Sequence, residues 1–292
     1  MEEQKNSMNI QWYPGHMTKT RRMMEEDLKL VDAVCEILDA RIPISSRNPD
    51  IDAICGKKPR MVILNRIDMA DADLVSRWSN YFKGKGMAVI RTDCKSRKGI
   101  NTFAPAVRQL LAEKLQRYAE KGQVGRPLKL MVVGIPNVGK STFINQIAGR
   151  KGAKAENRPG VTRGKQWVNV DGGLLLLDTP GILWPKFDDP EVGMRLAYTG
   201  AVKDDILDTE TLGCHLMELL AREYPQALVE RYKIEIPTKI DGWELLQAAG
   251  RKRGFLISGG EVDTERMARV LLDEYRSCKL GTFTLERPEE LA

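Results

Sequence analysis

A glycine-rich stretch that ends in a lysine and a serine is the clearest place for chemistry in this chain of 292 residues. Residues 134–141 read G-I-P-N-V-G-K-S, which is the spacing G-x-x-x-x-G-K-S. Glycines let the backbone wrap closely around phosphate oxygens with its N–H groups pointing inward. The lysine then reaches the β- and γ-phosphates, and the serine hydroxyl contacts Mg²⁺. The predicted nucleotide contacts here are Gly134, Asn137, Val138, Gly139, Lys140, Ser141 and Thr142, with Ser141 also on the metal.

The flanks of this loop supply the structure that the motif requires. Residues 128–133 are apolar and β-branched enough for a buried strand. Residues 142–148 can form a helix that Gly149 ends. The start of that helix adds a positive dipole end beside the phosphates. A chance glycine turn would lack both flanks, so we favour a phosphate-binding loop.

Short apolar runs alternate with helical patterns over the first two thirds of the chain. Strands are predicted at 33–38, 60–64, 88–91, 128–133, 166–170 and 174–177. This alternation implies a parallel sheet with right-handed crossovers, whose ligands bind at the carboxyl ends of the strands. Only helices are predicted beyond residue 190, near 191–199, 209–222, 226–232, 242–250 and 263–278. The predicted fold class is therefore α/β with a smaller all-α C-terminal domain.

Two other strand ends carry residues suited to a nucleotide. Asp178 begins D-T-P-G, where an aspartate can lie near Mg²⁺ and the N–H of Gly181 can meet a γ-phosphate. Residues 65–68 read N-R-I-D, and the Asp68 carboxylate can accept hydrogen bonds from guanine N1–H and its amino group. Adenine offers no matching donor pair. N-x-x-D alone is a weak signal, but beside the other two motifs it becomes strong. The predicted base-site contacts are Asn65, Arg66, Ile67, Asp68, Asp93 and Cys94.

The order of these motifs is unusual, because the base-reading loops precede the phosphate loop. A circular permutation would produce this order, with residues 105–127 joining the old end to the old beginning on the surface. The helix predicted in that connector has one apolar face, formed by Val107, Leu110, Leu111, Leu115 and Tyr118. We expect a disordered leader at 1–9, a nucleotide-binding domain at 10–188 and a helical domain at 189–292.

Composition narrows the class of protein. Hydrophobic residues make up 42% of the chain and the formal net charge is +6, which mildly favours a polyanionic partner. Five scattered cysteines show no metal-ligand spacing, so we expect reduced thiols in a cytoplasm. No apolar run reaches the length that spans a membrane, and we expect no membrane partner and a monomer.

Taken together, the motifs resemble those of circularly permuted P-loop GTPases, and within them the bacterial ribosome biogenesis GTPase A family. Besides the loops above, the resemblance rests on residues 12–17 (W-Y-P-G-H-M), 39–43 (D-A-R-I-P), 45–49 (S-S-R-N-P) and 253–260 (R-G-F-L-I-S-G-G). It implies GTP hydrolysis coupled to late maturation of the large ribosomal subunit, with GTP, GDP and rRNA as partners. It also implies RNA contact by the helical domain. Arg66 stands where the family usually has lysine.

The resemblance also suggests roles for three residues, each with a plainer alternative. Thr162 would close on Mg²⁺ in the GTP state, or it is an ordinary loop threonine. Asn137 would help to hold K⁺ near the phosphates, or it only forms a turn. His16 would orient the attacking water, or it only caps a helix or touches RNA. Ile182 follows D-x-x-G where many GTPases have a water-orienting glutamine. His215 lies in a helical stretch, and we assign it no role.

Two other functions stay open from the sequence. The chain could be a nucleotide-gated RNA-binding module in which hydrolysis is incidental, or an enzyme that uses ATP. Basic residues near 19–22, 150–165 and 251–253 could contact RNA phosphates or simply form solvated faces.

Overall fold

The computed structural model describes residues 17–149, 166–170, 172–179, 189–202 and 208–291. Its contacts divide the chain into two compact units. The sheet unit holds the described residues of 11–187 together with 283–291, and the helical unit holds those of 188–282. The sequence placed 283–292 in the helical domain, so the boundary in the structure differs at the C-terminal end. The proposed leader at 1–9 lies outside the described residues.

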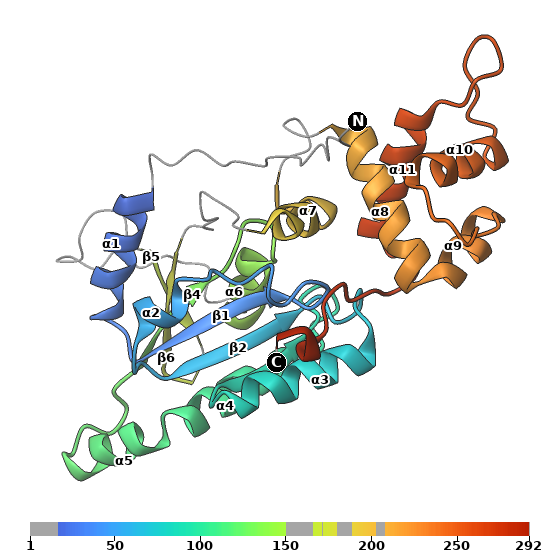
Figure 1. Ribbon diagram of the computed structural model, residues 1–292. Coiled ribbons are helices and arrows are strands. Elements are labelled where there is room, and N and C mark those ends of the chain that lie inside the picture. Colours follow the sequence, from blue (N-terminus) through green and yellow to red (C-terminus); the bar gives the residue numbers. More distant parts are fainter. Residues whose placement is uncertain (1–16, 150–165, 171, 180–188, 203–207, 292) are drawn as a thin grey trace. The chain divides into compact units, whose positions relative to one another are not determined.

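Six strands form the central sheet in the order β3-β2-β1-β4-β6-β5 (Figure 1). They span Ala33–Asp39 (β1), Arg60–Asn65 (β2), Ala88–Thr92 (β3), Leu128–Val133 (β4), Gln166–Val170 (β5) and Leu174–Asp178 (β6). All neighbouring pairs are parallel except β5 with β6. β1 is buried along its whole length, as expected for a parallel strand covered on both faces. The parallel α/β sheet predicted from the sequence is confirmed.

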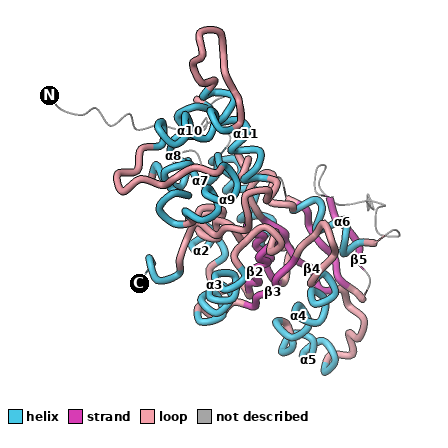
Figure 2. The backbone as a smooth tube through the Cα atoms, turned by 90° about the vertical axis from the view of Figure 1, so that its right-hand side faces the viewer, coloured by secondary structure: helices cyan, strands magenta, loops and turns pink. Residues whose placement is uncertain are grey.

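Helices cover both faces of this sheet (Figure 2). On one face α1 (Met17–Leu28) and α2 (Ile51–Cys55) pack against β1, β4 and β6 through residues such as Met24, Ile51 and Met131. On the same face α3 (Ala72–Gly84) buries Trp78 and Phe82 against β2. The other face carries α4 (Phe103–Leu110) and α6 (Lys140–Ala148). Two rings from these helices, those of Phe103 and Phe143, meet edge to face at 5.2 Å.

The connector between β3 and β4 differs from its prediction. The single expected helix is interrupted at Leu111, which has φ −108° and ψ 23°. α4 ends at Leu110, and α5 (Ala112–Glu120) continues beyond it with none of its residues buried. Val107 and Leu111 belong to the core, whereas Leu115 and Tyr118 are only half-buried. Only the first half of the predicted apolar face therefore packs on the sheet.

The C-terminal tail binds the loop that follows β1. The Glu286 side chain is 3% exposed and accepts hydrogen bonds from the N–H groups of Ile44 (2.6 Å) and Ser45 (2.9 Å) and from the Ser45 hydroxyl. The N–H of Leu285 donates to the Arg41 carbonyl (2.8 Å), and Trp78 Nε1 donates to the Glu286 carbonyl (3.0 Å). Loss of the Glu286 carboxylate would leave buried donors unpaired, at about 1–3 kcal/mol for each group.

The helical unit contains α7 (Pro190–Tyr198), α8 (Thr209–Glu223), α9 (Pro225–Tyr232), α10 (Gly242–Lys252) and α11 (Thr264–Arg276). Four of them begin with an aspartate whose side chain accepts from a first-turn N–H, and these caps are Asp189, Asp208, Asp241 and Asp263. α8 crosses α11 at Gly213, where a Cβ would come within 2.4 Å of the Ala268 Cβ. The close crossing is therefore possible only because residue 213 has no side chain.

The buried carboxylate of Glu274 pairs with Arg253, one of the basic residues that could have contacted RNA. Glu274 accepts from Arg253 Nη2 (2.9 Å), from Arg231 Nε (3.0 Å) and from the Tyr232 hydroxyl (2.9 Å). Burial opposes the ionisation of Glu274, but these hydrogen bonds outweigh it and lower the pKa of the carboxyl. Arg253 thus holds the helices together, while Arg251 and Lys252 stay exposed.

Candidate nucleotide site

The loops predicted to bind a nucleotide meet at the carboxyl edge of the sheet. Asn65 at the end of β2 pairs in register with Asp39 of β1 and Thr92 of β3. Asp178 at the end of β6 pairs with Val132 of β4. The phosphate loop follows β4 directly, and the second base loop follows β3. This edge is where parallel α/β sheets bind their ligands.

Asn65 ties three of these loops together. Its amide nitrogen donates to the Val138 carbonyl in the phosphate loop (2.9 Å). Its amide oxygen accepts from the Thr92 hydroxyl (3.1 Å) and from the Cys94 N–H (3.3 Å). The side chain is only 2% exposed. Asn65 therefore positions the loops around the nucleotide site, a role for which its two-sided amide is suited.

Gly139 must be a glycine because of this asparagine. A Cβ at residue 139 would lie 2.4 Å from Asn65 Nδ2, and the backbone there has φ +99°. Both conditions exclude an ordinary side chain. The second glycine of the phosphate loop is thus required by close contact with a residue of the base-reading loop.

Lys140 and Asp178 face each other at the start of α6. Lys140 Nζ donates to Asp178 Oδ1 (2.6 Å) and to the Thr179 carbonyl. The Thr179 hydroxyl in turn donates to the Val132 carbonyl (2.7 Å), which fixes the chain as it leaves β6. The lysine provides a cation for the phosphates, and the aspartate provides a carboxylate for the metal that accompanies them.

The oxygen donors near Lys140 fit Mg²⁺. Ser141 is exposed in the first turn of α6, and Asp178 is partly exposed at the end of β6. Mg²⁺ takes one or two protein oxygens and completes its shell with phosphates and water. No group of three or more histidine, cysteine or acidic side chains suited to a metal occurs in the described part of the chain. These residues suit a metal that arrives with a nucleotide.

Asp68 is the carboxylate predicted to bind the base. It is exposed, in contrast to the buried Asp93 of the neighbouring loop. Neighbouring groups take some water from its carboxylate, and this loss of hydration, together with the negative charge of Asp93, raises the pKa of Asp68. Asp93 Oδ1 accepts from the N–H groups of Lys95 (2.8 Å) and Ser96 (3.2 Å), so its own carboxylate shapes a turn. Cys94 is buried, and burial raises the pKa of its thiol to about 11.

Arg66 and Asn137 connect the two nucleotide loops on the outside. Both have positive φ, 62° and 60°. Arg66 Nη2 donates to the Asn137 carbonyl, and Arg66 Nε lies 3.7 Å from Asp39 Oδ2. The arginine found in place of the family's usual lysine therefore spans from β1 to the phosphate loop. Asparagine tolerates this left-handed conformation, which agrees with a turn-forming role for Asn137.

A buried ion pair between Asp39 and Arg41 lies next to Arg66. Asp39 accepts from Arg41 Nε (2.9 Å) and Arg41 Nη2 (2.7 Å), and both residues are almost fully buried. Burial opposes the charge on Asp39, but Arg41 and Arg66 outweigh it and lower the pKa of the carboxyl. The pair holds the loop that the C-terminal tail also binds. Asp39 and Arg41 are only two residues apart, but their contacts with Arg66 and with the Leu285 N–H join distant parts of the chain and leave no local pattern.

Three of the predicted site residues lie outside the described residues. These are His16, Thr162 and Gly181. Their assignments stay predictions.

Comparisons with known proteins agree with this geometry. Residues 129–233 match a family model described as 50S ribosome-binding GTPase. Ribosome biogenesis GTPase A of Priestia megaterium is 48% identical over 97% of this chain and 98% of its own. The chain belongs to the ribosome biogenesis GTPase A family. As a member of it, the chain is a GTPase, and it has the circularly permuted motif order of this family.

Two solved structures are similar to this ribosome biogenesis GTPase A family member over nearly its whole length. The GDP-bound structure of TM YlqF has a TM-score of 0.67 at 27% identity, covering 92% of this chain and 100% of that one. The GNP-bound YlqF from T. maritima has a TM-score of 0.63 at 26% identity, covering 93% and 99%. The first of these relatives is bound to GDP and the second to GNP.

Proposed function

We propose that the chain is a GTP-gated assembly factor that acts late in maturation of the large ribosomal subunit and binds its rRNA. The observation that carries this is the joining of the phosphate loop to the guanine-reading loop by Asn65, within a chain that matches a 50S ribosome-binding GTPase model. The chain would act as a monomer in the cytoplasm. In the described residues no helix has the length and apolar content needed to cross a bilayer.

The γ-phosphate, which GTP has and GDP lacks, would control the conformation of the loops around the site. Ser141 and Asp178, with Thr162 on sequence grounds, would hold Mg²⁺, which neutralises charge on the β- and γ-phosphates when bound. Lys140 would exchange its contact with Asp178 for the phosphates. The segments that contain Thr162 and Gly181 would be ordered by the γ-phosphate and released after hydrolysis. This ordering would change how the protein holds the ribosomal subunit.

The large subunit is expected to bind more tightly with GTP than with GDP, and to raise the rate of hydrolysis. Co-sedimentation with purified large subunits in the presence of a non-hydrolysable GTP analogue or GDP measures the first effect. Turnover with and without the subunits measures the second. Binding that is indifferent to the nucleotide would contradict the gated model. If maturation proceeds normally with a variant that binds but does not hydrolyse GTP, hydrolysis is incidental to function.

Potassium is the second proposed cofactor. A cation beside Asn137 would offset charge in the transition state, as an arginine finger does. Turnover is expected to be faster in K⁺ than in Na⁺, and Asn137→Ala should reduce that difference. Equal rates in both salts would leave Asn137 with the turn-forming role that its positive φ already supports.

A further inference from the structure

The end of the sheet opposite the nucleotide loops has a groove of its own. Its volume is about 1170 Å³, and it is lined by the residues that precede β1, β2 and β3, by α4 and α5, and by the connector to β4. The nucleotide loops follow the carboxyl ends of the same parallel strands. A strand of six residues spans about 20 Å. A molecule in this groove and a nucleotide therefore occupy opposite ends of the sheet.

The groove is strongly basic. Eight lysines and arginines line it, against the two carboxylates of Asp32 and Glu113. Asp32 is already engaged, because it pairs with Lys114 Nζ and accepts from the Lys129 N–H (2.8 Å). Glu113 lies 3.8 Å from Arg117 on the exposed surface of α5. Arg60 is paired as well, with Glu36 and Asp52. A local excess of positive charge remains after these contacts, since Lys57, Lys58, Lys85, Lys121 and Arg126 also line the groove.

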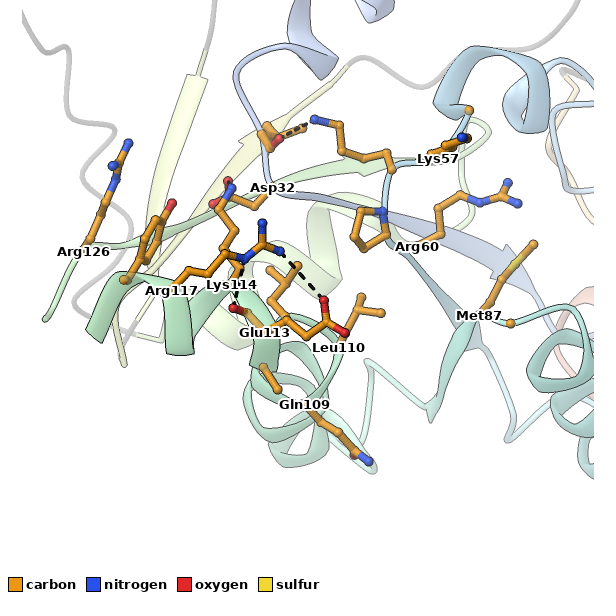
Figure 3. Close-up of a pocket in the computed structure, with 18 of the residues that line it drawn as sticks. Asp32, Lys57, Arg60, Met87, Gln109, Leu110, Glu113, Lys114, Arg117 and Arg126 are labelled. Carbon is orange, nitrogen blue, oxygen red and sulfur yellow. Dashed lines mark hydrogen bonds and ion pairs between the residues drawn. The ribbon is translucent and has the colours of Figure 1, made fainter. Parts of the chain in front are cut away.

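The cations that line the groove come from separate elements. Figure 3 shows Lys114 and Arg117 of α5 on one side and Lys57, which precedes β2, on the other. Arg60, the first residue of β2, also lines the groove, but its guanidinium pairs with Glu36 and Asp52. Arg126 stacks over the Tyr118 ring at 4.9 Å, which fixes that guanidinium at the rim. A single phosphate would engage only a few of these groups. The spread of charge suits an extended polyanion.

The lining also argues against a protein segment as the occupant. Protein interfaces concentrate their binding energy in apolar and aromatic anchors that fill pockets. Among the described residues, none that lines the groove is an exposed large hydrophobic side chain. Val31, Met87 and Leu111 line it but are buried in the core. What the groove offers a partner is charge and hydrogen-bond donors.

We propose that this groove binds the phosphate backbone of RNA. The inference rests on the proposed function and adds a contact surface in the sheet unit, apart from the basic segments predicted at 19–22, 150–165 and 251–253. Lysine and arginine contacts to phosphate carry no sequence information, so the groove positions the protein on a ribosomal subunit. It leaves the nucleotide site open, so RNA can stay bound throughout the GTPase cycle.

A matched pair of triple variants tests the groove. Lys57→Gln, Lys85→Gln and Lys121→Gln together remove three exposed groove cations. Lys29→Gln, Lys83→Gln and Lys98→Gln remove three exposed lysines of the sheet unit that do not line it. Affinity for rRNA extracted from purified large subunits is measured at several salt concentrations, with GTP affinity as the check on folding.

The groove triple is expected to weaken rRNA binding at least about tenfold and to lower the log–log salt slope by about 2–3, because each phosphate contact contributes about one. GTP affinity and the control triple should match the unaltered protein. If both triples lose the same affinity for rRNA, or if neither loses any, the groove assignment is wrong. The proposed function still stands in that case, because the unaltered protein binds rRNA. If the unaltered protein does not bind rRNA, both the groove assignment and the proposed function are wrong. Polyglutamate that binds the groove more tightly than rRNA would replace RNA with an acidic protein as the occupant.

Discussion

Asp68→Asn is expected to weaken GTP binding by a few kcal/mol, about a hundredfold or more, and to make xanthosine triphosphate the better ligand. The exposed Asp68 carboxylate can accept both guanine donors, N1–H and the 2-amino group. In asparagine one of the two carboxylate oxygens is replaced by an NH₂ group, which is a donor. This donor then faces a guanine donor, and each hydrogen-bonding group left without a partner costs about 1–3 kcal/mol. Xanthine has a carbonyl where guanine has the amino group, so the amide N–H₂ of asparagine finds an acceptor again.

Affinities for GTP and xanthosine triphosphate, measured by nucleotide competition, check this expectation. Asp73→Asn is the matched control, because Asp73 is an exposed aspartate in the first turn of α3 and its variant should bind GTP normally. A pH series adds a second readout. The pKa of Asp68 is raised, so GTP affinity of the unaltered protein should be full well above that pKa and fall as the pH drops through it. Unchanged GTP affinity in Asp68→Asn would remove the guanine assignment.

His16→Ala is expected to leave GTP affinity near normal and to reduce subunit-stimulated turnover about a hundredfold, the usual scale for a positioned general base. The reason is the residue after D-x-x-G: Ile182 has no group that could orient water. The chain has only two histidines, and His215 lies in α8 of the helical unit. His16 follows a Pro-Gly turn, from which a neutral imidazole could reach over the nucleotide.

Turnover and subunit affinity must be measured separately for this variant. If His16 only caps a helix or touches RNA, the variant should bind large subunits less tightly yet hydrolyse GTP at the normal rate once bound. That result would reject the catalytic role. His215→Ala serves as the control, and both its turnover and its GTP affinity should stay unchanged.

The strands and the order of the motifs followed from the sequence because they depend on local patterns. The run 128–133 was predicted to the residue, and β5 was as well. Apolar, β-branched residues bounded by glycine and polar turns favour a buried strand wherever they occur. Parallel strands then bring their carboxyl ends to one edge, so the sequence predicts that Lys140, Asp178 and Asp68 lie at the same edge of the sheet.

The hydrogen bonds between these loops depend on the tertiary structure. Asn65 contacts Val138, 73 residues away, and Glu286 contacts Ser45, 241 residues away. Such hydrogen bonds leave no periodic signal in the chain, because each depends on a side chain meeting a distant backbone group of the right polarity. The same holds for Arg253, which the local charge pattern grouped with exposed neighbours but which pairs with the buried Glu274. A residue's type and spacing determine which chemistry it can perform, and its distant neighbours determine whether it remains available for that chemistry.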